Sequence, residues 1–269
     1  MRLISFNAYR TFDVPGAAYI KPELLFRHRE EVAAADWVLF PEYWQVNAVV
    51  YGLKRRIFPS VASYHLGHDK VEMTRVLEAA FPQHVPWTEI RAATEAEVEA
   101  LLGLFDPPFI VKEVRSSRGR GVHRIESRGA FRDYARSRDV LYVQELLPID
   151  RDLRVVWVGD RVVDAYWRIA PEGGLHNNVA RGGRVSFESV PPAAVAVVER
   201  VARALGIDHA GFDVAVVDGH CYILEFNVLF GNEALNARGH RLGPVILDYL
   251  RRRTEPPGNP PAPMLPTAG

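Results

Sequence analysis

Cysteine, lysine and net charge are all scarce in this sequence of 269 residues. The single cysteine, Cys221, excludes an intrachain disulfide framework and any cysteine-rich zinc module. The 33 basic residues balance the 33 acidic ones, so the zero net charge gives no general electrostatic reason to expect nucleic acid or a membrane surface as partner. No apolar run approaches the roughly 18–20 residues of a membrane span, and the apolar stretch at the N-terminus is too short for a signal sequence. We therefore expect a soluble, cytoplasmic protein.

The composition is that of an ordinary globular protein, with 48% hydrophobic and 25% charged residues. The length suffices for a sizeable core in one or two domains. Only four of the basic residues are lysines, namely Lys21, Lys54, Lys70 and Lys112. Because arginine replaces lysine so freely here, a retained lysine is slightly more informative than usual, since a compact ammonium fits pockets that a guanidinium does not.

The first 60 residues predict a small α/β unit with a parallel sheet. Strands are expected at Arg2–Phe6 and Asp36–Phe40, and helices at Pro22–Ala35 and Tyr43–Arg56. The next segment, about 69–105, is predicted to be mostly helical. It begins with Asp69 as the cap of a helix over 70–80 and contains a second helix that starts after Thr94.

From Pro108 onward the pattern favours β-structure. The expected strands are 109–114, 122–125 and 141–147, followed by the hairpins 153–158/162–169 and 211–217/221–226. Helices are expected at 195–205, ending at Gly206, and at 242–253. The proline-rich segment 255–269 predicts a disordered tail.

The second hairpin carries two carboxylates on otherwise apolar strands. Glu225 and Asn227 share one face by period-2 geometry, and pairing across the turn brings Asp213 beside them. Two crowded carboxylates repel unless a cation lies between them, and hard oxygen ligands of this kind suit Mg²⁺. The alternative is that these side chains are solvated on the open face of a sheet.

Lys112 and the glycine-rich turn 116–121 form a second candidate site. Such a turn can direct backbone N–H groups at phosphates, and a lysine within an apolar run is costly to bury without an anion. The alternative is an ordinary hairpin turn beside a lysine that reaches water. Eight arginines against two acids between Arg115 and Arg138 indicate either a polyphosphate or nucleic-acid patch, or a solvated helix face.

These motifs, taken in order over residues 69–240, resemble the ATP-grasp superfamily, and most closely its RimK-type amino-acid ligases. Two of the four lysines, Lys70 and Lys112, fall on the two nucleotide-contacting lysines of that family. The resemblance implies three further groups of nucleotide-binding residues: a phosphate-covering loop, an adenine-reading hinge, and a ribose-binding acid with an amide near the γ-phosphate. These are, respectively, Ser116, Ser117, Arg118, Gly119 and Gly121; Gln144, Glu145, Leu146 and Leu147; and Asp152 and Asn178.

The resemblance also assigns the residues at the reacting groups. It implies that Asp213, Glu225 and Asn227 ligate magnesium. It further implies that arginines hold the acyl carboxylate and stabilise the transferring phosphoryl group, and these are Arg154, Arg168 and Arg181.

The implied architecture is an α+β ATP-grasp fold, in which two subdomains clasp ATP, preceded by a short α/β unit. The expected boundaries are 1–65 for the N-terminal unit, 66–147 and 148–254 for the two subdomains, and 255–269 for the tail. The implied reaction joins a carboxylate to an amine through an acylphosphate, with ATP and one or two Mg²⁺ (or Mn²⁺) as cofactors.

The implied partners are an amino acid or peptide, with a protein as a further candidate acceptor, and the family is often oligomeric. Two alternatives stay open at this stage. One is a nucleotide- or nucleic-acid-binding module without ligase activity, and the other is a ligase with a thiol acceptor.

Overall fold

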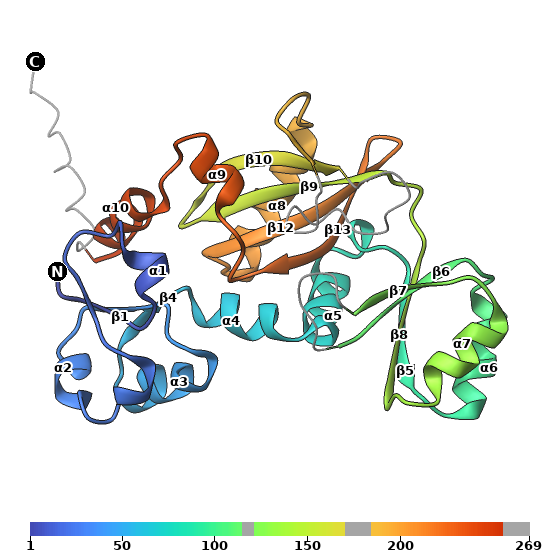
Figure 1. The fold of residues 1–269 in the computed structure, drawn as a ribbon, viewed down its shortest axis with the longest axis horizontal. Helices are drawn as coiled ribbons and strands as arrows, with labels where there is room; N and C mark the ends of the chain where they lie inside the picture. The colour runs from blue at the N-terminus through green and yellow to red at the C-terminus, as the bar shows by residue number, and fades with distance from the viewer. Residues whose placement is uncertain (115–120, 170–183, 255–269) are drawn as a thin grey trace, which may run out of the picture. The chain divides into compact units, whose positions relative to one another are not determined.

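The computed structural model describes residues 1–114, 121–169 and 184–254, and its contacts divide the chain into two compact units (Figure 1). Among the described residues, the first unit contains 1–58 and 241–254, and the second contains those within 59–240. The expected boundaries, at residue 65 and with 148–254 as one subdomain, differ from this division. Helix α10 (Leu242–Thr254) belongs with the first unit, where the Trp37 indole donates to Thr254 Oγ1 at 2.7 Å.

The first unit is built on a four-stranded sheet in the order β2-β1-β3-β4, and all of its pairings are parallel, as predicted. The strands are β1 (Leu3–Ser5), β2 (Ala17–Tyr19), β3 (Trp37–Leu39) and β4 (Arg56–Phe58). Besides α10, the helical elements are α1 (Ala8–Thr11), the 3₁₀ turn η1 (Pro22–Leu24), α2 (Arg29–Ala33), α3 (Tyr43–Asn47) and the π-helical turn η2 (Ala48–Gly52).

Two helix predictions in this unit are too long. The expected helix Pro22–Ala35 is split into η1 and α2, because the backbone of His28 departs from helical geometry with ψ at 23°. The expected helix Tyr43–Arg56 ends at Gly52, and Lys54 adopts a left-handed conformation with φ at +57°, which a continuing right-handed helix excludes.

The second unit begins with two capped helices, α4 (Val61–His68) and α5 (Lys70–Ala80). Asp69 accepts a hydrogen bond from the backbone N–H of Val71 at 2.8 Å, which confirms it as the cap of α5. The 3₁₀ turn η3 (Pro82–His84) follows. The backbone N–H of Lys70 donates to the carbonyl of Val114 at 3.3 Å, which ties the start of α5 to the end of a strand in the next sheet.

That next sheet has four antiparallel strands in the order β5-β8-β6-β7. The strands are β5 (Thr88–Ala92), β6 (Phe109–Lys112), β7 (Val122–Ile125) and β8 (Val140–Glu145), and the accompanying helices are α6 (Glu95–Leu104) and α7 (Arg128–Ala135). Strand β5 lies inside the segment predicted to be mostly helical. Its sequence, TEIRA, carries little alternation, so its strand state depends on pairing with β8.

The remaining sheet has five strands in the order β11-β10-β9-β12-β13. These strands are β9 (Arg151–Val158), β10 (Arg161–Ile169), β11 (Arg184–Ser186), β12 (His209–Val217) and β13 (His220–Asn227). Helix α8 (Pro192–Leu205) packs on one face of the sheet through Val197, Val198 and Val201, and it ends at Gly206 with φ at +68°, as predicted. The short helix α9 (Glu233–Ala237) follows β13. The opposite face of the sheet therefore remains for polar side chains.

Among the described residues, no helix is long and apolar enough to cross a membrane.

Candidate active site

The β12–β13 hairpin places its polar side chains in register. Asp218 and Gly219 both have positive φ, at 50° and 82°, as a two-residue type I′ turn requires. The pairing sets Asp213 opposite Glu225 and Gly211 opposite Asn227, so the two carboxylates lie on one face of the sheet, as predicted. The Asn227 side-chain N–H donates to Glu225 Oε1 at 3.2 Å, which confirms that these two residues share this face.

A β-bulge at Leu224 directs Glu225 to this face. The register shifts so that Val214 pairs with Ile223 while Asp213 pairs with Glu225, which leaves Leu224 as the extra residue. Ile223 and Phe226 both pack into the core, whereas in a regular strand residues 223 and 225 would point the same way. The bulge therefore lets one strand fill the core and still present Glu225 among polar groups.

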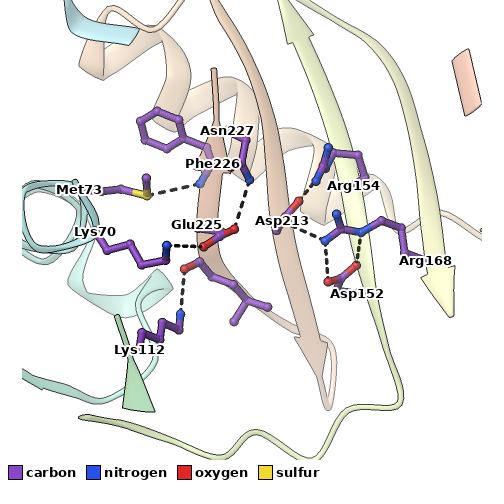
Figure 2. A network of polar contacts seen from close by, with 11 residues as sticks. Lys70, Met73, Lys112, Asp152, Arg154, Arg168, Asp213, Glu225, Phe226 and Asn227 are labelled. Carbon is purple, nitrogen blue, oxygen red and sulfur yellow. Dashed lines mark hydrogen bonds and ion pairs between the residues drawn. The ribbon is translucent and has the colours of Figure 1, made fainter. Parts of the chain in front are cut away.

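Asp213 is surrounded by arginines rather than by solvent (Figure 2). Its side chain accepts from Arg154 Nε at 2.6 Å and lies 2.9 Å from Arg168 Nη2. Arg168 also makes two hydrogen bonds, each 2.7 Å long, to the carboxylate of Asp152. With Asp213 only 5% exposed, the open-face alternative is wrong for this residue.

The pKa values in this cluster follow from burial and opposite charge. Burial by itself raises the pKa of the Asp213 carboxyl, but the charges of Arg154 and Arg168 outweigh burial and hold the pKa below its ordinary value. Burial likewise lowers the pKa of Arg168, but the carboxylates of Asp213 and Asp152 raise it above its ordinary value. These shifts favour the charged forms of Asp213 and Arg168. Burial raises the pKa of the Asp152 carboxyl above its ordinary value, although Arg168 lowers it.

The second carboxylate faces lysines. Glu225 Oε2 lies 3.8 Å from Lys70 Nζ at the start of α5. Lys112 Nζ donates to the carbonyl oxygen of Leu224 at 3.3 Å and lies 5.4 Å from the centre of the Tyr142 ring. Lys112 is 6% exposed, so the alternative of a lysine that reaches water is wrong, and its partners among the described residues are a carbonyl and a ring.

The surroundings of Lys70 disfavour its charge. Burial lowers the pKa of Lys70, Glu225 raises it, and the neighbouring Lys112 lowers it, with a net result below the ordinary value. Besides Glu225, the carboxylates of Asp69 and Glu113 also raise the pKa of Lys70, but burial outweighs them. Two neighbouring lysines that are both largely buried suit a polyanionic ligand.

The donor set of the hairpin fits magnesium. Two carboxylates in register and the Asn227 amide are the hard oxygen donors that Mg²⁺ prefers. The protein's own cations relieve the predicted repulsion between the carboxylates, so Asp213 has to exchange an arginine contact for a metal contact. Glu225, with its side chain 23% exposed and its nearest described cation 3.8 Å away, can accept a cation with less rearrangement.

The predicted adenine hinge lies at the end of β8. Gln144 is buried and donates from Nε2 to Thr88 Oγ1 at 2.8 Å, and Glu145 Oε1 accepts from the Trp87 backbone N–H at 2.7 Å. Both side chains are thus held by residues in or next to β5, which leaves Leu146 and Leu147 as the half-buried chain that follows. A ligand contact through the hinge backbone stays a prediction.

Several predicted site residues lie outside the described residues. Of the phosphate-covering loop only Gly121 is described, and its carbonyl accepts from the Glu113 N–H at 2.7 Å. The others outside the described residues are Ser116, Ser117, Arg118, Gly119, Asn178 and Arg181.

The structure adds site residues that sequence reasoning missed. Gly211 lies so close to Arg154 that a Cβ there would come within 2.9 Å of Arg154 Nη1 and 3.0 Å of Phe230 Cγ. Tyr166 is buried beside Arg154 and Arg168, and burial raises the pKa of its hydroxyl although both arginines lower it. Strand alternation around Arg168 could have indicated Tyr166, but no local signal indicated Gly211.

The described arginines of the 115–138 cluster are paired with acids, which weakens the case for a nucleic-acid patch. Each of these arginines forms an ion pair with N–O distances of 2.6–3.0 Å. The pairs are Arg124–Glu126, Arg128–Asp106, Arg132–Glu99, Arg136–Asp133 and Arg138–Glu113. Their positive charge is therefore largely compensated within the protein.

Comparison with known proteins identifies the family. The model of the RimK-like ATP-grasp domain matches residues 67–246, and the chain belongs to this family. The match includes the charged residues around Asp213 and around Glu225, and it confirms the predicted ATP-grasp fold.

Two curated relatives and one solved structure show how far the likeness extends. A probable alpha-L-glutamate ligase of Citrobacter koseri is 31% identical over 156 residues, which are 55% of this chain and 52% of the relative. A ribosomal protein bS6--L-glutamate ligase of Escherichia coli O1:K1 / APEC is 33% identical over 134 residues, 48% of this chain and 45% of the relative. The chain thus spans about half the length of these relatives.

Among solved structures, the ATP-grasp ligase PsnB, in complex with a phosphomimetic variant of its minimal precursor, Mg and ADP, superposes with a TM-score of 0.68. The superposition covers 95% of this chain and 99% of PsnB at 16% identity. At that identity the likeness shows the shared fold.

Proposed function

We propose that the protein is an ATP-dependent carboxylate–amine ligase. The observation that supports this best is the pairing of two carboxylates in register, with two lysines beside one and two arginines beside the other, within a RimK-like ATP-grasp domain. The arrangement offers separate positions for a nucleotide's phosphates, for a divalent cation and for an anionic substrate.

The reaction divides into two substitutions. A substrate carboxylate attacks the γ-phosphorus of ATP, ADP leaves, and an acylphosphate forms. An amine then attacks the acyl carbon, phosphate leaves, and the nitrogen loses a proton to give an amide. Phosphoryl transfer of this kind depends mainly on positioning and charge neutralisation.

Seven of the residues around Asp213 and Glu225 have a direct role in this scheme. Lys70 and Lys112 neutralise the nucleotide phosphates, while Arg154 and Arg168 hold the substrate carboxylate and the transferring phosphoryl group. Asp213, Glu225 and Asn227 would hold one or two Mg²⁺ (or Mn²⁺), which neutralise charge on the phosphate oxygens when bound. The two neighbouring arginines suit a substrate that is itself a carboxylate.

The names of the relatives guide the choice of substrates. Glutamate ligation is named for both curated relatives, and a precursor peptide is bound in the PsnB structure. We propose that L-glutamate is one substrate and that a peptide or protein is the other, in the cytoplasm where ATP and amino acids are supplied. A thiol acceptor is the competing assignment for the second step.

Trapping the acylphosphate with hydroxylamine tests the proposal without knowledge of the natural amine. The full chain is incubated with MgATP, hydroxylamine and a panel of carboxylates that includes L-glutamate and peptides ending in glutamate. Hydroxamate and ADP should form in equal amounts for at least one carboxylate. In a second incubation an amine or a thiol replaces hydroxylamine, and mass spectrometry of the product separates an amide from a thioester.

Glu225→Gln should abolish hydroxamate formation, whereas Glu99→Gln should not. Glu99 forms an exposed ion pair with Arg132 at 2.6 Å, so it provides the same chemical change in an ion pair distant in sequence from the hairpin. Failure of the folded wild-type protein to bind ATP would refute the ligase assignment.

A further inference from the structure

Arg168 is held between two carboxylates that differ in how firmly they bind it. Asp152 receives two hydrogen bonds, from Nε and Nη2 of Arg168, both 2.7 Å long. Asp213 has a single contact with Arg168, at 2.9 Å from Nη2 (Figure 2). A two-point pair fixes the plane of a guanidinium, whereas a one-point contact does not.

The backbone brings this pair together. Asp152 on β9 lies directly opposite Arg168 on β10 in the antiparallel register, and Asp213 on β12 pairs with Arg154 on the other side of β9. The four side chains thus form a row across three adjacent strands. The row is a property of the sheet and does not depend on a bound ligand.

The Asp152 carboxylate offers little surface to a further partner. Its side chain is 10% exposed, and both of its oxygens accept hydrogen bonds from Arg168. The resemblance to the family implies that Asp152 binds ribose, and ribose hydroxyls would have to compete with a charged, two-point partner for the same oxygens.

We propose that Asp152 is a positioning residue that holds Arg168 at the transferring phosphoryl group. The assignment rests on the proposed ligase function. If Asp213 held magnesium, Arg168 would give up its one-point contact and would keep the two-point pair with Asp152. Its Nη2, relieved of Asp213, and its Nη1, for which the described residues provide no partner, can then donate to the γ-phosphoryl oxygens.

Asp152 would keep Arg168 in place when Asp213 is engaged by a metal ion. Arg168 Nη2 lies 2.9 Å from Asp213, so its guanidinium would be repelled if that carboxylate held a divalent cation. Without a second anchor Arg168 would move away from the reacting phosphoryl group at the moment that it is needed there.

Nucleotide binding to the full chain distinguishes positioning from ribose binding. The dissociation constants of ADP, of the non-hydrolysable imido analogue of ATP, and of 2′- and 3′-deoxy-ADP are measured with Mg²⁺ by calorimetry on wild type and Asp152→Asn. We expect the affinity of Asp152→Asn for ADP to stay within about twofold of wild type. Affinity for the imido analogue should fall about 10- to 100-fold, as loss of a charge-assisted hydrogen bond implies.

The affinities for the deoxy nucleotides show the opposite result if Asp152 binds the ribose. The wild type would then prefer ADP over one deoxy nucleotide, and Asp152→Asn would lose that preference together with its ADP affinity. That result overturns the positioning role and leaves the ligase proposal intact. Failure of the wild type to bind any nucleotide overturns both assignments, so the two failures are distinguishable.

Two further variants keep the test decisive. Asp106→Asn changes an exposed aspartate that pairs with Arg128 at 2.9 Å, and it should leave every affinity unchanged. Arg168→Lys keeps the charge but loses the two-point pair, so it should reproduce the selective loss even if Asp152→Asn does not fold. The double variant should be no worse than either single one, because both remove the same interaction, whereas additive losses would contradict the proposal.

Discussion

The two carboxylates of the β12–β13 hairpin are cross-strand neighbours, yet their surroundings differ in kind. Asp213 is fully enclosed by two arginines at 2.6 and 2.9 Å, while Glu225 keeps 23% of its side chain exposed, with one lysine at 3.8 Å. The first carboxylate is bound into the protein and the second is loosely held. We infer that one half of the site provides rigid positioning and the other half is ready to accept a ligand.

The largest effect should come from breaking the enclosed half. Asp213→Ala leaves the buried Arg154 and the largely buried Arg168 without their shared carboxylate, which typically costs about 3–5 kcal/mol of unfolding free energy. Glu225→Gln should change the unfolding free energy by about 1 kcal/mol or less, since its ion pair is long and partly solvated. Urea denaturation of both variants measures the difference, and equal losses would contradict the comparison.

The second prediction concerns the space beside Arg154. Gly211→Ala places a methyl group about 2.9 Å from Arg154 Nη1, so Arg154 has to move away from Asp213. A displacement of this size should lower turnover about 100-fold, with a stability cost of about 1–3 kcal/mol. Hydroxamate formation measures the turnover.

Gly103→Ala is the matched control for this change. Gly103 lies in α6, and a Cβ there would meet no atom within 4 Å, so turnover should match wild type. Wild-type turnover in Gly211→Ala would show that the position of Arg154 does not matter.

The third prediction concerns Lys112, in the half of the site that contains Glu225. Lys112→Met removes a buried charge whose described partners are a carbonyl and a ring, so folding should be no less stable than in wild type. ATP affinity should fall about 10- to 100-fold because the charge that faces the phosphates is lost. Calorimetry and thermal denaturation on the same sample check both statements. The exposed Lys21→Met should change neither, and a loss of stability in Lys112→Met would assign that lysine to structure.

The last prediction concerns no substitution, only the reactivity of Cys221, which lies in the core near the turn end of the same hairpin. Burial raises the pKa of the Cys221 thiol, so its reactive thiolate forms only at a higher pH than that of an exposed cysteine. Iodoacetamide should therefore alkylate the folded protein much more slowly at pH 8 than the urea-denatured protein. Similar rates would place Cys221 outside the core.

Sequence reasoning was most successful where the structural cause is local. The cap at Asp69, the left-handed Gly206 after α8 and the Asp218–Gly219 turn each depend on a few adjacent residues, and the structure confirms all three. Alternation along a strand likewise placed Glu225 and Asn227 on one face correctly. The family resemblance supplied the fold and the order of the site motifs, and the family match confirms the fold.

Predictions failed where packing overrides local preference. Strand β5 was missed because its strand state depends on β8, a partner about 50 residues away. The bulge at Leu224 has no signature in the sequence, although it alone directs Glu225 out of the core. Long-range contacts also join α10 to the first unit, for example between Trp37 and Thr254, which are 217 residues apart.

The sequence by itself determined the local features, namely the cap at Asp69, the Asp218–Gly219 turn and the common face of Glu225 and Asn227, because capping, turn chemistry and alternation act over a few residues. The family resemblance indicated which charged residues belong to the site. Only the tertiary structure decided which cation faces which carboxylate. Arg154 and Asp213 are 59 residues apart, and Lys112 and the Leu224 carbonyl are 112 residues apart. Such pairs form when the register of a sheet and the docking of a helix bring distant charges within a few ångströms, and short-range interactions along the chain do not encode that choice.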